Sequence, residues 1–172
     1  MAYSVLSLDA GAVLKNLPEG YTLETPLAHI KTGKFSDGLE SLQVLQTLSG
    51  SLMLGNPKTD QPQEIRELHY ASYLMQAGRY SDALLSLTKL QKELVKMDGH
   101  QPPESFIEGL HLLMGIANTG LSATYGLRHN AFSETSKATG EPDLDNNQSA
   151  SIDHLRIAEQ EFALLKGLLS KN

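Results

Sequence analysis

The stretch AGRYSDALLSLTKLQ (residues 77–91) repeats an earlier stretch of the same chain, TGKFSDGLESLQVLQ (residues 32–46). The two copies are identical at eight of fifteen aligned positions. About one identity would be expected by chance, so we interpret the pair as a duplicated structural unit. Both copies read, in order, glycine, a basic residue, an aromatic residue, Ser-Asp, a small residue and leucine.

The second copy starts a predicted helix. Its apolar residues recur at steps of three or four positions, namely Leu84, Leu87, Leu90, Leu94 and Met97. Ser81 stands where a helix N-cap is expected, so the pattern predicts a helix over 81–97. Apolar residues at the same spacing after Pro62 predict a preceding helix over 63–77, which ends at Gly78 in the left-handed conformation.

The first copy predicts the same arrangement in a shorter form. Ser36 is the expected cap, and an apolar stripe follows it at Leu39, Leu42, Leu45 and Leu52. Thr25 and Pro26 form a cap-and-first-turn pair that opens a short helix ending at Gly33. The chain therefore contains two predicted helix pairs, at about 25–53 and 63–97.

The rest of the chain also predicts helices. Pro102 and Pro103 precede a helix over 103–125, followed by a weaker helical stretch over 127–136. The segment 137–149 has almost no apolar content and reads as a flexible loop. A closing helix over 150–170 carries Ile152, Leu155, Phe162, Leu165 and Leu169 on one face. We expect an all-α fold and a single domain over residues 1–172.

Composition excludes several classes of function. The formal net charge of −6 disfavours nucleic acid or an anionic membrane surface as the main partner. The chain contains no cysteine, so it has neither disulfides nor thiolate chemistry. Its start lacks the features of a signal peptide and no apolar run is long enough to cross a bilayer, which predicts a cytoplasmic protein without membrane insertion.

Each part of the repeated unit has a physical role. The glycine lets the first helix end, and the small residue, Gly38 or Ala83, allows the two helices to approach closely. The aromatic ring, Phe35 or Tyr80, is expected to fill the gap between the two antiparallel helices. Such a pair cannot bury its apolar face alone, so pairs are expected to stack.

These residues resemble the turn of a tetratricopeptide repeat (TPR), in which a glycine, an aromatic residue and an alanine follow one another at fixed spacing. The second copy supplies Gly78, Tyr80 and Ala83, with Ala71 and Leu74 on its first helix. The first copy supplies Gly33, Phe35 and Gly38. The copies lie 45 residues apart, whereas the family repeats every 34 or so, and the tryptophan common near the start of the family's first helix is absent.

The resemblance implies a short TPR-like α-solenoid with a C-terminal closing helix, whose groove binds a peptide or helix of another protein. Helix 63–77 would line this groove with Arg66, His69, Tyr70, Tyr73 and Gln76. Tyrosine and arginine are frequent anchors in protein interfaces. Packing between helices is the alternative role for Tyr70 and Tyr73.

A search for catalytic or metal-binding patterns finds only Glu108 and His111, three residues apart on one helix. Helical di-iron proteins use two such pairs, and the sequence offers no second one. We therefore expect no catalytic residues, no metal and no cofactor. The leading hypothesis is a non-enzymatic adaptor or chaperone. A structural subunit of a larger assembly, self-association into a homo-oligomer and, remotely, a helical-bundle metal protein or enzyme are the alternatives.

Overall fold

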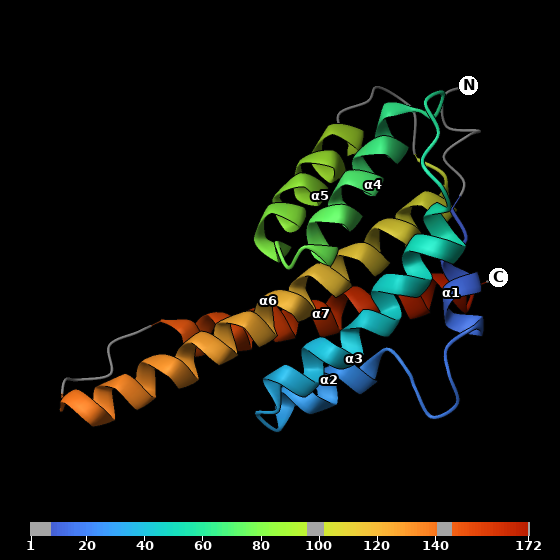
Figure 1. The fold of residues 1–172 in the computed structure, drawn as a ribbon. Coiled ribbons are helices and arrows are strands. Elements are labelled where there is room, and N and C mark those ends of the chain that lie inside the picture. The colour runs from blue at the N-terminus through green and yellow to red at the C-terminus, as the bar shows by residue number, and fades with distance from the viewer. Residues whose placement is uncertain (1–7, 96–101, 141–145, 172) are drawn as a thin grey trace.

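The computed structural model describes residues 8–95, 102–140 and 146–171 of the chain. Over these ranges the protein is helical and has no strand, which confirms the all-α expectation (Figure 1). The elements are α1 (Ala10–Lys15), α2 (Glu24–Lys31), α3 (Phe35–Leu48), the π-helical η2 (Ser49–Leu54), α4 (Gln63–Gln76), α5 (Tyr80–Val95), α6 (Glu104–Thr139) and α7 (Asn147–Leu169).

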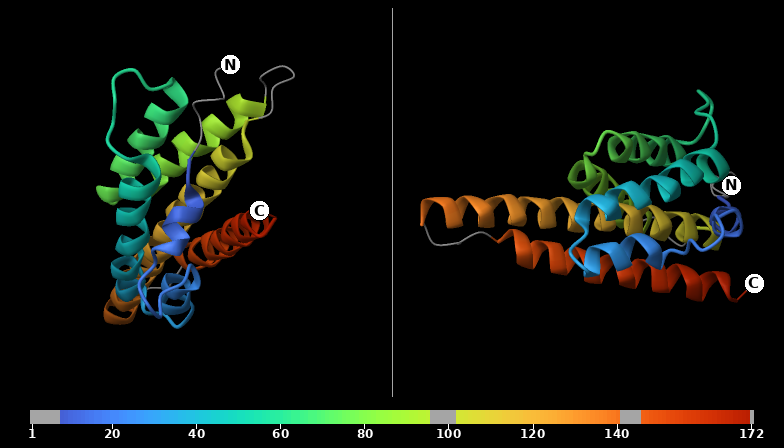
Figure 2. Two further views of the ribbon diagram at one scale, coloured as in Figure 1. Left: turned by 90° about the vertical axis from the view of Figure 1, so that its right-hand side faces the viewer. Right: turned by 60° about the horizontal axis from the view of Figure 1, so that its bottom comes forward.

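The long helix α6 is the centre of the molecule. It packs along α7, and two shorter helix pairs, α2–α3 and α4–α5, pack against it (Figures 1 and 2). The first pair contacts α6 through both helices and the second mainly through α5, whereas η2 lies between α3 and α4. The two pairs are thus joined to each other through η2 and through their shared support, α6.

The turn inside each pair has the same hydrogen bonds. Gly78 has a φ of 78°, which confirms the predicted left-handed stop, and Gly33, where the earlier helix was predicted to end, has a φ of 81°. The N–H of Gly78 donates to the carbonyl of Met75 at 2.9 Å, and the N–H of Arg79 donates to that of Leu74 at 2.8 Å. The first pair repeats both bonds, from Gly33 to Ile30 and from Lys34 to His29. This Schellman turn caps the first helix and reverses the chain within three residues.

The predicted serine caps are wrong. Helix α3 begins at Phe35 with Lys34 as its N-cap, which makes no side-chain bond to the helix, and α5 begins at Tyr80. Ser36 and Ser81 therefore lie inside the first turn. The reason is that the residue after the left-handed glycine already takes the N-cap position, so the aromatic residue becomes the first residue of the helix.

The predicted opening of α2 at Thr25 is also displaced. The helix begins at Glu24, and the Oγ1 of Thr22 accepts a hydrogen bond from the N–H of Glu24 at 3.2 Å. Thr25 instead accepts a bond from the N–H of Thr22 at 2.8 Å. Both threonines thus stabilise the chain where it enters α2.

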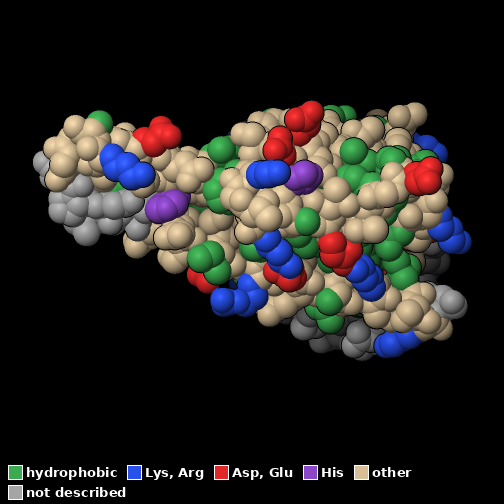
Figure 3. Space-filling model, turned by 90° about the horizontal axis from the view of Figure 1, so that it is seen from below, with side chains coloured by type: hydrophobic (Ala, Val, Ile, Leu, Met, Phe, Trp, Pro, Cys, Tyr) green, Lys and Arg blue, Asp and Glu red, His purple; other side chains and the backbone are tan. Residues whose placement is uncertain are grey.

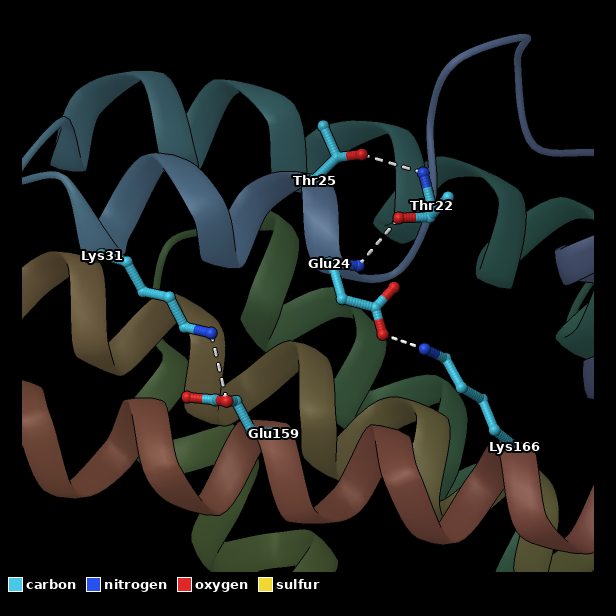
Figure 4. Close-up of polar contacts among 6 residues, drawn as sticks. All are labelled: Thr22, Glu24, Thr25, Lys31, Glu159 and Lys166. Carbon is cyan, nitrogen blue, oxygen red and sulfur yellow. Dashed lines mark hydrogen bonds and ion pairs between the residues drawn. The ribbon is translucent and has the colours of Figure 1, made fainter.

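Two ion pairs tie α2 to α7. Seen from below, the surface of the molecule shows acidic and basic side chains interspersed (Figure 3). Lys31 pairs with Glu159 at 3.2 Å, and Glu24 pairs with Lys166 (Figure 4). Each of these side chains is about half exposed. Exposed ion pairs contribute about 0–1 kcal/mol each to the free energy of unfolding. Their main effect is therefore on the orientation of α2 against α7.

Helix α6 runs farther than the sequence predicts. The expected helix 103–125 and the weaker stretch 127–136 form one helix of 36 residues that ends before Gly140, whose φ is 74°. The predicted loop 137–149 is wrong at both ends, because 137–139 belong to α6 and 147–149 to α7. Its middle, 141–145, lies outside the described residues.

Two residues predicted on buried faces are exposed. Leu52 is 40 % and Ile152 is 51 % exposed. At Leu52 the cause is the passage of α3 into η2, since a π-helix has more residues per turn and rotates the following side chains around the axis. Near Ile152 the buried position belongs to Ser151, which bonds to Ser122 of α6. Met97 lies outside the described residues.

Three aromatic rings pack directly onto glycines of α6. A Cβ atom built on Gly120 would lie 2.3 Å from the ring of Tyr80. The same construction gives 2.4 Å for two further pairs, namely Gly126 with Phe35 and Gly115 with Phe162. The aromatic residue of each repeated unit therefore anchors its helix pair to a third helix, which the sequence does not predict. The small residues act as expected, since a Cβ on Gly38 would lie 2.7 Å from Ile30 of α2.

We expect Gly120→Ala to lower the free energy of unfolding by about 1–3 kcal/mol, because the added methyl group overlaps a ring that has little room to move. Urea denaturation of the purified protein measures this. The matched control is Gly167→Ala in α7, where a Cβ meets nothing within 4 Å and where alanine should stabilise the helix by about 0.5–1 kcal/mol. Equal effects of the two substitutions would contradict the ring-on-glycine contact.

Candidate functional site

One face of α4 carries the residues that the sequence singles out. The opposite face is buried against the rest of the protein through Ile65, Leu68, Ala71, Leu74 and Met75. Because of the helical period, Arg66, Tyr70, Tyr73 and Gln76 point outward, and all four are exposed. Tyr70 is 56 % and Tyr73 is 59 % exposed, so neither is a packing residue. The structure thus brings four of the five predicted residues together on the surface.

Two hollows formed by described residues adjoin this face. The first, which we call the tyrosine hollow, measures about 520 Å³ and is lined by Lys58, Arg66, Tyr70 and their neighbours. The second, the amide hollow, measures about 620 Å³ and is lined by polar side chains of α3, α4 and the loop after η2, among them Gln43, Thr47, Asn56, Ser72 and Gln76. Pro57, His69 and Tyr73 line both hollows, so we treat them as one surface, the α4 groove.

His69 differs from the other four predicted residues. It is 7 % exposed, and its Nε2 atom is buried with no hydrogen-bond partner within the described part of the chain. Burial lowers the pKa of His69, which favours the neutral imidazole. An unpaired buried polar atom costs about 1–3 kcal/mol. A leucine would avoid this cost, so the imidazole at the junction of the two hollows is a candidate functional group.

The wall opposite α4 is built by the residues that lengthen the spacing between the two copies. They form η2, which ends at Gly55 with φ of 67°, and the loop that leads to Pro62. The loop is held by a hydrogen bond from the N–H of Lys58 to the Oε1 of Gln61 at 3.0 Å. Short π-helical segments are frequent at functional sites. The departure from regular repeat spacing therefore supplies one side of the groove.

A buried hydrogen-bond chain fixes the floor of the amide hollow. The hydroxyl of Tyr80 donates to the Oε1 of Gln46 at 2.7 Å, and the Nε2 of Gln46 donates to the carbonyl of Met75 at 3.5 Å. Burial raises the pKa of Tyr80. These bonds link α3 to the turn of the α4–α5 pair. The sequence analysis did not predict this role of Gln46, although the match between Gln46 and Gln91 in the two copies could have indicated that the glutamine has a structural role.

The charge on the groove is positive, although the chain is acidic. Lys58 and Arg66 line the tyrosine hollow, and the structure shows no ion pair for either with any described residue. None of the described residues that line the two hollows is Asp or Glu. The groove thus presents two positive charges beside neutral hydrogen-bonding groups.

Glu108 and His111 do not act as a pair. The Nδ1 of His111 lies 2.5 Å from the Oε2 of Glu161, which links α6 to α7. Glu108 is buried, and burial together with the nearby charges of Glu104 and Asp9 raises its pKa. Within residues 8–95, 102–140 and 146–171, no three His, Asp or Glu side chains lie close enough to bind a metal ion.

No helix in these ranges combines the length and apolarity needed to cross a membrane.

We expect His69→Leu to raise the free energy of unfolding near neutral pH by about 1 kcal/mol, because it removes the unpaired polar atom. The pKa of His69 is lowered on folding from 6.5, so the unfolded chain binds a proton more readily. Acidification through this range should therefore destabilise the wild type more than the variant. Urea denaturation at about pH 8 and about pH 5.5 measures the difference. Parallel pH dependence in both proteins would contradict the burial of an unpaired imidazole.

Comparison with known proteins gives no precedent for the α4 groove. No protein-family model matches the chain, and no match was found among curated proteins or solved structures. The functional argument therefore rests on the side chains of the α4 groove and their surroundings.

Proposed function

We propose that the protein is a non-enzymatic protein–protein interaction module, an adaptor or chaperone that holds a peptide or helix of a partner in the α4 groove. The observation that carries this proposal is the exposure of Tyr70 and Tyr73 side by side with Arg66 on one helix face. Two tyrosines more than half exposed leave apolar surface in water that a bound chain would cover. Tyrosine and arginine are also the side chains most enriched among interface anchors.

The groove has the rigidity that a binding surface requires. Its tyrosines are on a regular helix whose other face is buried, and its floor is fixed by the bond between Tyr80 and Gln46. A surface that is already ordered loses little conformational entropy on binding. Residues on such a surface can therefore contribute most of their contact energy to affinity.

We further propose that the two helix pairs are TPR-like repeats. Their support is the shared Schellman turn at Gly33 and Gly78 and the ring that follows each glycine. In this proposal η2 and its loop are an insertion between consecutive repeats of a short solenoid, which α7 closes. The proposed place of action is the cytoplasm, as composition suggests.

A second candidate, a structural subunit of a larger assembly or a homo-oligomer, is favoured by the end of α6. Residues 127–139 of α6 are largely exposed, and Leu127 and Phe132 are among the exposed apolar side chains. This end projects beyond the start of α7 (Figure 2). An isolated helix of this length is marginal in water, so another chain packed against it would stabilise it. Size-exclusion chromatography separates the candidates, because an obligate subunit should self-associate or aggregate alone.

For the groove we expect Tyr73→Ala to weaken capture of the partner while the free energy of unfolding changes by no more than about 0.5 kcal/mol. Loss of an interface anchor costs at least about 1 kcal/mol of binding free energy. Pull-down from an extract of the native cells, with identification of the bound proteins, measures capture.

The matched control is Leu164→Ala, which removes an exposed apolar side chain of similar exposure from α7. It should leave the captured proteins unchanged. If Tyr73→Ala lowers stability and captures the same proteins as the wild type, Tyr73 is a structural residue and the groove is not the binding site.

A further inference from the structure

We propose that the segment held by the α4 groove is an extended, acidic stretch within a partner chain, with its carboxylate side chains beside Lys58 and Arg66 and its main chain along the amide hollow. This inference rests on the proposed function and specifies the chemistry of the partner. Three independent features of the groove support it, namely its charge, its unused hydrogen-bonding groups and the buried imidazole of His69.

The first feature is charge. The chain has 20 acidic and 14 basic residues, so a groove whose described lining contains two basic residues and no acidic one departs from the average surface. The face formed by α2 and α7 is different, because its lysines Lys31 and Lys166 pair with acidic residues (Figure 4). A partner carboxylate would give Arg66 and Lys58 the counter-charge that the described part of this chain does not give them.

The acidic residues near these cations in sequence do not reach the groove. Asp60, Glu64 and Glu67 line neither hollow. Glu67 instead accepts a hydrogen bond from the Nε2 of Gln63 at 3.2 Å. Arg66 presents several N–H donors that fit a carboxylate, and the hydroxyls of Tyr70 and Tyr73 add donors on the same face. The tyrosine hollow thus matches an Asp or Glu side chain with an apolar stem.

The second feature is the set of unused hydrogen-bonding groups in the amide hollow. Gln46 in its floor is hydrogen-bonded, but five other polar side chains of its lining make no side-chain hydrogen bond to any described residue: Gln43, Thr47, Asn56, Ser72 and Gln76. An extended peptide has free main-chain N–H and C=O groups that need such partners, whereas a helix has already paired its own. The amide hollow therefore favours an extended segment over an amphipathic helix.

The third feature is His69, which lies at the junction of the two hollows. Its side chain is more than nine-tenths buried, and its Nε2 has no partner among the described residues. Apolar side chains placed over this position would leave the polar atom unpaired, whereas a polar segment brings donors and acceptors close to it. The unpaired imidazole thus favours a polar occupant over an apolar one, which agrees with the other two features.

The experiment uses a displayed library of random dodecapeptides, each flanked on both sides by Gly-Ser linkers, selected on the full-length protein. Three baits are compared: the wild type, a Lys58→Glu/Arg66→Glu variant, and a control variant, Arg156→Glu, which reverses an exposed charge on α7. We expect peptides enriched on the wild type and on the control to contain more Asp and Glu than the input. The groove variant should lose this bias, since it would repel the same peptides.

A peptide enriched on the wild type is then synthesised with both ends blocked and a fluorescent label, and its affinity is measured by anisotropy. The Arg66→Glu substitution should weaken binding at least about tenfold. Raising the salt concentration from about 0.05 M to about 0.5 M should also weaken it, because screening shortens the range of charge attraction. Thermal denaturation shows whether the variants stay folded.

The outcomes separate this inference from the proposed function. Enrichment of neutral or apolar peptides whose binding is lost on Tyr73→Ala would overturn the acidic partner and leave the groove as a binding site. Acidic peptides that bind the groove variant as well as the wild type would also overturn it, as would binding that requires a free peptide C-terminus. If no peptide is enriched on any bait, both the inference and the proposed function fail.

Discussion

The packing of aromatic rings on glycines of α6 is the contact on which the rest of the structure depends. Tyr80 and Phe35 are each the first residue of their helix and lie on Gly120 and Gly126, so the two helix pairs meet α6 where no side chain separates them from its backbone. Close approach of this kind increases dispersion contacts along both helices. It also helps to position the second pair relative to α3, because Gln46 of α3 accepts a hydrogen bond from the hydroxyl of Tyr80 in α5 and donates one to the carbonyl of Met75 in α4. The shape of the α4 groove, which lies between α3 and α4, therefore depends on the packing of the Tyr80 ring on Gly120.

The partner of α6 on its other side is held by polar contacts as well as by apolar ones. Along the α6–α7 interface, Ser122 bonds with Ser151, Asn118 with His154, and His111 with Glu161. Each bond is satisfied at only one alignment of the two helices, because a shift by one turn would leave a buried polar group unpaired. Phe162 on Gly115 adds an apolar contact that needs the same alignment. We interpret these contacts as fixing the register of α7, so that α6 offers a constant surface to the two helix pairs.

The sequence predicted well what depends on neighbours in the chain and poorly what depends on distant ones. The glycine stops and the small residue Gly38 follow from local geometry, and the structure shows both. The aromatic residue was expected between the helices of its own pair, but its contact with α6 is set by tertiary packing. Leu52 was misplaced because a π-helical turn has no apolar signature of its own. For the groove, helical spacing placed Arg66, Tyr70, Tyr73 and Gln76 together. It did not foresee the burial of His69 or the contribution of Gln46, since both depend on the position of α3 and η2.

We interpret the burial of His69 as a loss of stability that serves binding, and not as a defect of packing. Apart from Ser72, the other buried residues of α4 are apolar, so leucine could fill the same position with little loss of contact area. The π-helical wall opposite is irregular as well, and Ser49 at its start has a buried hydroxyl with no partner among the described residues. Of these two residues, His69 lines both hollows and Ser49 lines neither. An unpaired buried polar atom reduces stability without aiding the fold. By contrast, the buried polar side chains Asn118, Ser122 and Ser151 at the contact of α6 with α7 are hydrogen-bonded. The unpaired imidazole of His69 beside the exposed tyrosines distinguishes the α4 groove from an ordinary gap between helices.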